Sequence, residues 1–233
     1  MYVLRLKNIL IIFIIIFTTI VGVISYNSNK TEVISNKNYS KVIVVDAGHG
    51  LPDGGATSYD IVESDLNLQV SLKLYDELES RGYKVIMTRK DENNIAGEDN
   101  QSASIAKMKA QDLNNRVKII NESNADFCIS IHMNKFENPK YWGWQTFYNK
   151  NSEDGKKLAN LIQNNISKVI DKNNKRTSLS IDGIKIVDKT NIPVVIVECG
   201  FISNEEEAKL LQSEEYRLKL VQGIANGIEE FYD

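Results

Sequence analysis

Short, mostly apolar runs rich in β-branched residues, separated by amphipathic stretches, constrain the fold of this chain more than any other feature. Val42–Val45 is such a run, and Phe127–Ile131 and Val194–Val197 are two more. A strand that is apolar at successive positions is buried on both faces, as in a parallel sheet covered by helices. We therefore expect an α/β fold: a single domain with a twisted, mostly parallel sheet of about six strands and helices on both faces.

Hydrophobic periodicity predicts the other elements. Apolar residues recur every fourth position from Leu66 to Leu78, which indicates a helix, and Ser64 is placed to cap it. Further helices are expected at residues 105–121, at residues 158–169 and around Tyr216, Leu220, Ile224 and Ile228, and further strands at 84–88, 143–148 and 184–187.

The first 40 residues differ from the rest of the chain. Arg5 and Lys7 precede an apolar run from Ile9 to Ile24. Positive charge before such a run is typical of a signal peptide or a membrane anchor whose following residues are exported. We assign residues 1–25 to this leader, cleaved or retained. Residues 26–40, rich in Asn, Ser, Lys and Thr, are interpreted as a flexible tether, and residues 41–233 as the folded, extracytoplasmic domain.

Charge and cysteine content narrow the function classes. The formal net charge is −3, so the chain lacks the basic surface that nucleic-acid binding requires, and we expect no nucleic-acid partner. Cys128 and Cys199 both lie in apolar runs, which predicts two buried thiols.

The two histidines of the chain each follow a predicted buried strand, His49 in DAGHG and His132 in SIHMN. Because ligands gather at the carboxyl ends of parallel strands, both imidazoles should reach one edge of the sheet. Two carboxylates are placed to join them: Glu63 just before a helix, and Glu198 after Val194–Val197. A carboxylate beside so apolar a run is costly to bury unless it meets a cation or hydrogen-bond donors.

This set of groups is typical of a catalytic zinc site. Two imidazoles and one carboxylate bind zinc in several hydrolases and leave the fourth position open for water. Zinc lowers the pKa of that water to about 7, and a second carboxylate can transfer its proton to the leaving amine. Cys199 adjoins Glu198, but neighbours on a strand point to opposite faces, so we do not expect it to be a fourth ligand. GxSxG, HExxH and Walker-type motifs are absent from the sequence.

Six segments resemble, in their order, the zinc-dependent N-acetylmuramoyl-L-alanine amidases of the type 3 family: VVDAGHGLPDGGA, VESDLNLQVSLKL, GYKVIMTRK, LNNRVKIIN, ADFCISIHMN and IPVVIVECGFISN. The resemblance runs from about Lys41 to Tyr232. It implies hydrolysis of the amide between N-acetylmuramic acid and L-alanine in peptidoglycan. It also implies one zinc ion held by His49, Glu63 and His132, with Glu198 as the catalytic residue. Ala47 and Leu51 stand where the family usually has a proline and a glycine. Neither position supplies a metal ligand, so we expect these differences to change the shape of the loop and not the chemistry of the site.

Within this family, residues 101–116 and the strand at Gly143–Asn149 most resemble the germination-specific amidases of spore-forming bacteria. This resemblance implies action in spore cortex, between the two spore membranes, before a separate deacetylase allows muramic δ-lactam to form. Arg116 matches a recurrent family arginine, for which we expect an ion pair inside the fold. Asn134, two residues beyond His132, is expected to bind substrate, although a turn residue closing the strand fits equally.

Two other hypotheses remain open. A peptidoglycan peptidase or sugar deacetylase would also use an open zinc site with a carboxylate base, but would release different products. A membrane-tethered wall-binding module without activity would be expected to have lost a ligand or the catalytic glutamate, and all four are present. A requirement for an accessory protein, for activity or for zinc retention, is a further hypothesis.

Overall fold

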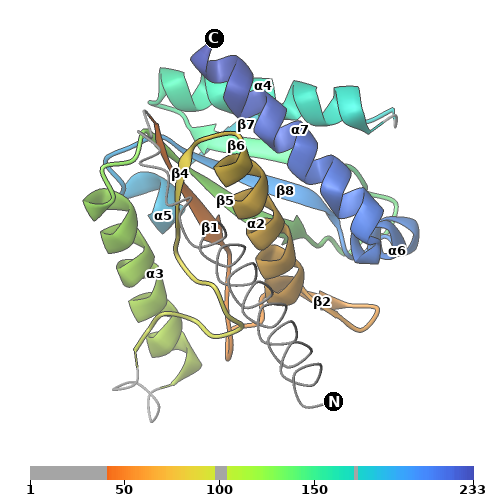
Figure 1. The fold of residues 1–233 in the computed structure, drawn as a ribbon. Coiled ribbons are helices and arrows are strands. Elements are labelled where there is room, and N and C mark those ends of the chain that lie inside the picture. Colours follow the sequence, from red (N-terminus) through yellow and green to blue (C-terminus); the bar gives the residue numbers. More distant parts are fainter. Residues whose placement is uncertain (1–40, 98–103, 171–172) are drawn as a thin grey trace, which may run out of the picture. The chain divides into compact units, whose positions relative to one another are not determined.

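Six strands form one sheet in the order β4-β1-β5-β8-β6-β7 in the computed structural model, which describes residues 41–97, 104–170 and 173–233 (Figure 1). The first four strands of this order are mutually parallel, β6 is antiparallel to β8, and β7 is parallel to β6. The expected α/β fold with a mostly parallel sheet is confirmed. The strands are β1 (Val42–Ala47), β4 (Lys84–Met87), β5 (Phe127–Asn134), β6 (Gln145–Asn149), β7 (Leu179–Ile181) and β8 (Val194–Phe201), and β2 (Thr57–Ser58) and β3 (Ile61–Val62) form a separate hairpin.

Helices cover both faces of the sheet, as Figure 1 shows. Ile43 and Val45 of β1 belong to a large core beneath one helical layer, whereas Val44 between them belongs to a smaller core on the opposite face. This alternation explains why the strand sequences are apolar at every position. The first layer contains α2 (Glu63–Ser80), α4 (Glu153–Val169) and α7 (Glu214–Tyr232); the second contains α3 (Ile105–Glu122) and α5 (Lys185–Asp188); α6 (Glu205–Gln212) follows β8.

The same alternation positions the predicted site. Cys128 and Ile196 contribute to the smaller core, on the α3 and α5 face, and His132 and Glu198 follow them at even spacing along β5 and β8. These two strands are adjacent, and His132 is the register partner of Glu198. The imidazole and the carboxylate are therefore cross-strand neighbours on one face. Both residues lie within their strands, near the carboxyl ends, rather than beyond them as the sequence indicated.

Two local predictions were wrong, and one short helix was missed. Residues 184–187 are not a strand, because α5 begins at Lys185 and buries Ile186 and Val187 against the smaller core; the edge strand is β7 instead. A four-residue segment with three apolar side chains does not distinguish a buried strand from one turn of buried helix. Ser64 does not cap α2, which begins at Glu63 and has Val62 at the N-cap without a side-chain hydrogen bond. The short helix α6 was not predicted.

Cys128 and Cys199 are buried free thiols, as predicted. The leader and the tether assigned to residues 1–40 lie outside the described residues. Within residues 41–97, 104–170 and 173–233, no helix combines the length and the apolar character needed to cross a membrane.

Candidate metal centre

Three of the predicted residues converge at the carboxyl ends of β1 and β5. Glu63 Oε1 lies 3.3 Å from Nε2 of His49 and 3.0 Å from Nδ1 of His132. One potential ligand atom from each residue lies within 4.8 Å of the others. The predicted association of His49, Glu63 and His132 is therefore present, although the two histidines lie 83 positions apart in sequence.

Two buried arginines hold the loop that carries His49. Arg116 of α3 donates to the carbonyl oxygens of Ala47, at 2.6 Å, and of His49, and it pairs with Asp46 and Asp112. Arg89 donates to the carbonyl oxygens of Ala47 and Gly48, at 2.9 and 3.0 Å. The expected ion pair of Arg116 is confirmed, and its hydrogen bonds to the loop add a positioning role. Arg89 lies in the GYKVIMTRK segment, but sequence reasoning did not single it out.

Glycines in this loop give the ligands room. A Cβ atom on Gly48 would lie 2.3 Å from Cε1 and Nε2 of His132, so any side chain there would displace that imidazole. Gly55 has a φ of +70°, and a Cβ atom there would lie 2.6 Å from Glu63 Oε2. The close approach that requires these glycines is therefore to the side chains of the candidate ligands His132 and Glu63.

Glu63 is buried and held by several donors. The amide of Ala56 donates to Oε2 at 2.8 Å, and the amides of Met133 and of the Asn67 side chain donate to Oε1 at 3.3 and 3.4 Å. Burial alone raises the pKa of Glu63, but the hydrogen bonds and charges of His132 and His49 outweigh burial and hold the pKa far below its ordinary value. The carboxylate is thus ionised and fixed in orientation, as a metal ligand must be.

Asp53 and Lys109 complete the surroundings of His49, and sequence reasoning missed both. Asp53 Oδ2 lies 3.1 Å from Nδ1 of His49 and 3.0 Å from Nζ of Lys109. A carboxylate on one imidazole nitrogen leaves the other to bind a cation. Burial lowers the pKa of His49, but Glu63 and Asp53 raise it more, so the net shift is upward. The i,i+4 spacing of His49 and Asp53 was the only available signal, and in a loop this spacing carries no geometric meaning.

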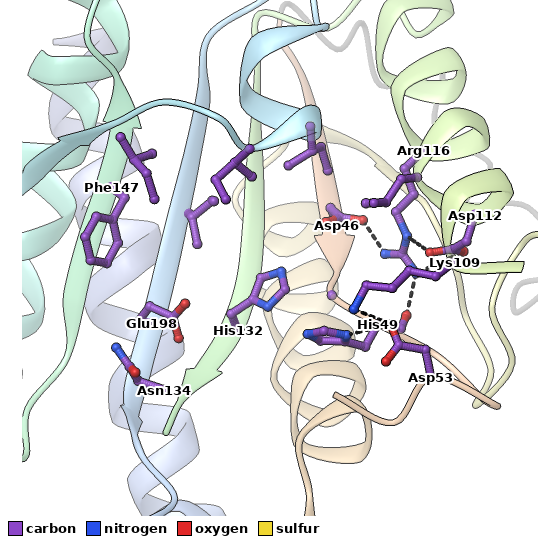
Figure 2. Close-up of a pocket in the computed structure, with 16 residues that line it drawn as sticks. Asp46, His49, Asp53, Lys109, Asp112, Arg116, His132, Asn134, Phe147 and Glu198 are labelled. Carbon is purple, nitrogen blue, oxygen red and sulfur yellow. Dashed lines mark hydrogen bonds and ion pairs between the residues drawn. The ribbon is translucent and has the colours of Figure 1, made fainter. Parts of the chain in front are cut away.

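Glu198 faces this cluster from β8, and Figure 2 shows its carboxylate and the His132 ring directed into the same space. Its Oε2 is buried and has no hydrogen-bond partner among the residues that the structure describes. Burial raises the pKa of Glu198 to about 7, with His132 lowering it and Glu63 raising it further. A buried acceptor without a donor is costly, so this oxygen is placed for a water or a substrate group.

The cluster borders a pocket of about 300 Å³ on the α3 and α5 face of the sheet. Asn134, at the end of β5, lines this pocket on the same side as Glu198 (Figure 2). Apolar residues from elements far apart in sequence also line the pocket: Leu113, Phe147, Ile181, Ile184, Ile186 and Ile196. The pocket therefore combines polar groups at one end with an apolar wall, as ligand sites commonly do.

The donor set fits zinc. Tetrahedral coordination with bonds of about 2.0–2.1 Å places ligand atoms about 3.3–3.4 Å apart. The measured separations of 3.0 and 3.3 Å from Glu63 Oε1 are close to this value. Imidazole nitrogen and carboxylate oxygen donors suit the same ion, and Glu198, whose buried Oε2 has no partner among the described residues, lines the same pocket as the two histidines.

Comparison with known proteins identifies the class of enzyme. Residues 43–230 match the Amidase_3 family, N-acetylmuramoyl-L-alanine amidase. The match covers most of the chain, so the chain belongs to this family and is an amidase of this class.

Individual relatives share both sequence and fold. The chain is 37% identical over 192 residues to the germination-specific N-acetylmuramoyl-L-alanine amidase of Bacillus subtilis (strain 168), covering 82% of this chain and 80% of that protein. The CwlD amidase from Clostridioides difficile, solved in complex with the GerS lipoprotein, is 43% identical with a TM-score of 0.80, covering 82% of this chain and 98% of that one. The catalytic domain of CwlV from Bacillus (Paenibacillus) polymyxa var. colistinus is 28% identical with a TM-score of 0.70, covering 83% of this chain and 98% of that domain.

Proposed function

We propose that this chain is a zinc-dependent amidase that separates L-alanine from N-acetylmuramic acid in spore cortex peptidoglycan, on the route to muramic δ-lactam. The observation that carries the zinc chemistry is the convergence of His49, Glu63 and His132 beside the unpaired Glu198 carboxylate. The spore assignment is supported by the similarity to the germination-specific amidase of B. subtilis and to CwlD.

His49, Glu63 and His132 would hold the zinc ion. When bound, zinc supplies a Lewis acid that polarises the amide carbonyl and lowers the pKa of water. Glu198 removes a proton from the attacking water through its unpartnered Oε2, and then donates that proton to the amide nitrogen as the bond to carbon breaks. Asp53 holds His49 through Nδ1, so that its imidazole keeps one orientation during the reaction.

Asn134 supplies an amide at the rim, next to the position of the scissile bond. Its side chain can donate to a substrate carbonyl and accept from a substrate N–H, which would fix the peptide bond relative to Glu198. The apolar wall formed by α5 and β7 leaves room for the non-polar part of the bound segment.

The test is digestion of purified cortex peptidoglycan by the full chain, with and without added zinc, followed by mass analysis of the fragments. We expect zinc-dependent release of stem peptides with an L-alanine amino terminus, and release by Glu198→Gln that is slower by at least about 100-fold. Fragments cut within the stem peptide, or deacetylated sugars, would replace this proposal with a zinc peptidase or a deacetylase. A folded, zinc-loaded chain that releases nothing would indicate a required accessory protein and, if adding such a protein restores no release, a binding module.

We also propose an extracytoplasmic location, with residues 1–25 as a signal peptide or membrane tether, and an accessory protein that supports activity or zinc retention. The complex of CwlD with the GerS lipoprotein supports the accessory protein. Purified chain that keeps its zinc through dialysis and reaches full activity alone would contradict this part of the proposal.

A further inference from the structure

The loop between β5 and β6 holds three aromatic side chains at the surface. Phe136, Tyr141 and Trp142 are 53%, 45% and 37% exposed, and we call them the aromatic platform. The platform begins two residues beyond Asn134, at the site, and ends three residues before Gln145, the register partner of Glu198. It therefore lies at the same edge of the sheet as the metal centre.

Buried and polar groups hold the backbone of this loop at several points. Glu207 of α6 accepts hydrogen bonds from the Gly143 amide at 2.9 and 3.0 Å. Ser203 Oγ accepts from the amide of Phe136 at 3.1 Å, and the side chain of Asn204 donates to the carbonyl oxygen of Pro139 at 2.8 Å. Arg176 donates through Nε to the Trp142 carbonyl oxygen at 2.8 Å.

Two of the three rings, those of Phe136 and Tyr141, are also held in place by ring contacts. Tyr141 packs between Phe136, with ring centroids 4.8 Å apart, and the buried Phe201 of β8, with centroids 6.3 Å apart. The Arg176 guanidinium lies 4.6 Å from the centroid of Phe201. Exposed aromatic surface on so well anchored a loop is preorganised, so binding a ligand there would cost little ordering entropy.

Two adjoining hollows flank Trp142 and share it together with Asn173. One, of about 490 Å³, is lined by Lys140, Lys175 and Arg176. Among the described residues, no acidic side chain lines this hollow, and neither Lys140 nor Lys175 forms an ion pair. The other, of about 300 Å³, is lined by Asn204, Glu206 and Glu207. An aromatic ridge between two hollows lined by amide and charged groups suits a row of sugar rings, which present apolar C–H faces and many hydroxyl groups.

We propose that the aromatic platform binds the glycan strand of peptidoglycan beyond the scissile bond, and that Lys140 and Lys175 bind carboxylates of its stem peptides. This inference rests on the proposed function, because that function makes the substrate a polymer that extends past the catalytic pocket. Trp142 stacks on a sugar ring, and the cationic hollow complements the negative charge of the peptides. The favoured occupant is a glycan strand rather than a protein partner, because the loop leads directly out of the catalytic pocket at Asn134.

The test measures co-sedimentation of the full chain with insoluble peptidoglycan, in the Glu198→Gln background so that the polymer is not consumed. We expect Trp142→Ala to weaken binding about tenfold or more, as loss of an aromatic anchor does, and Trp142→Phe to retain most of it. Leu218→Ala, which removes an exposed apolar side chain on α7, is the matched control and should bind like the parent. Zinc content and circular dichroism of each variant show that the fold is retained.

A second arm uses glycan strands from which the stem peptides have been removed. Trp142→Ala should weaken binding to both polymers, whereas a Lys140→Glu and Lys175→Glu double variant should weaken binding only where stem peptides are present. Binding by Trp142→Ala equal to that of Leu218→Ala would overturn the proposal and leave the platform as a surface for a protein partner. This binding assay does not depend on turnover, so the two proposals can fail independently. If the proposed hydrolysis is wrong but the platform binds glycan, the chain with Glu198 intact will release no peptides while binding still depends on Trp142.

Discussion

Glu198 is the residue on which the proposed chemistry depends most directly. Replacing it with Gln removes the proton acceptor but keeps the size of the side chain. We expect turnover to fall by about 100- to 10,000-fold, because a positioned acid–base group contributes about that much. Bound zinc, measured by metal analysis, should stay at the wild-type level, since Glu198 is not one of the three proposed ligands. Loss of zinc in this variant would instead make Glu198 a ligand.

Asp53 supports the site from behind His49. Asp53→Asn keeps the size of the side chain but removes the charge that faces His49 Nδ1 and Lys109. We expect zinc affinity to fall by about 10- to 100-fold, the usual effect of losing such an outer contact. Competition with a zinc-binding dye measures this change. The control variant is Lys109→Met, which removes the other ion-pair partner of Asp53. If Lys109→Met loses more zinc affinity than Asp53→Asn, then Lys109 contributes more to zinc binding than Asp53 does.

Asp46 is buried and ionised beneath the site. Burial raises its pKa, but Arg116, Ser130 and Thr88 lower it more, so the net shift is downward. A lowered pKa stabilises the fold above the unfolded value of about 3.9, and this stabilisation is lost as pH falls through the folded value. Asp46→Asn should therefore be less stable by about 3 kcal/mol near pH 7, since it breaks a buried pair.

The measurement is urea unfolding of the zinc-free chain from pH 7 down to pH 3. The difference between wild type and Asp46→Asn should shrink as the pH falls. A difference that stays constant with pH would mean that the effect comes from packing rather than from the charge of Asp46.

At the scale of elements, the loop after β1 has to pass very close to β5. Gly48→Ala would place a methyl group about where the His132 ring now lies, 2.3 Å from its atoms. We expect at least about a tenfold loss of zinc affinity, with the far-ultraviolet spectrum unchanged. Gly82→Ala is the control: it has a φ of +91° and an unobstructed Cβ position, so it should cost stability but leave zinc binding intact. Wild-type zinc affinity in Gly48→Ala would show that the loop can move away from His132.

At the scale of the whole molecule, the sheet separates the two cysteines and prevents a disulfide between them. Cys128 belongs to the smaller core and Cys199 to the larger one, so the thiols lie on opposite faces of the sheet. Burial raises the pKa of both thiols, which keeps them protonated. We expect no reaction with a thiol reagent in the native chain and two reactive thiols after unfolding, even after exposure to air. One or no reactive thiol in the unfolded chain would show that a disulfide had formed.

The sequence alone predicted the fold class and singled out the four candidate site residues. Continuous apolar runs require strands buried on both faces, and His49, His132 and Glu198 are placed at the ends of such runs, where few polar residues occur. Family resemblance then assigned Glu63 as the third ligand. The prediction of the fold class and the choice of candidate site residues both use local sequence patterns, which do not depend on how distant segments pack.

Only the tertiary structure decided which residues surround these groups. The register that pairs His132 with Glu198, the clamp formed by Arg89 and Arg116, and the contact of Asp53 with His49 all depend on distances between separate segments. Packing also determined the secondary structure of residues 184–187, because one helical turn covers the sheet there. Local sequence specifies which side chains are apolar or charged, but packing between distant segments determines which of them meet.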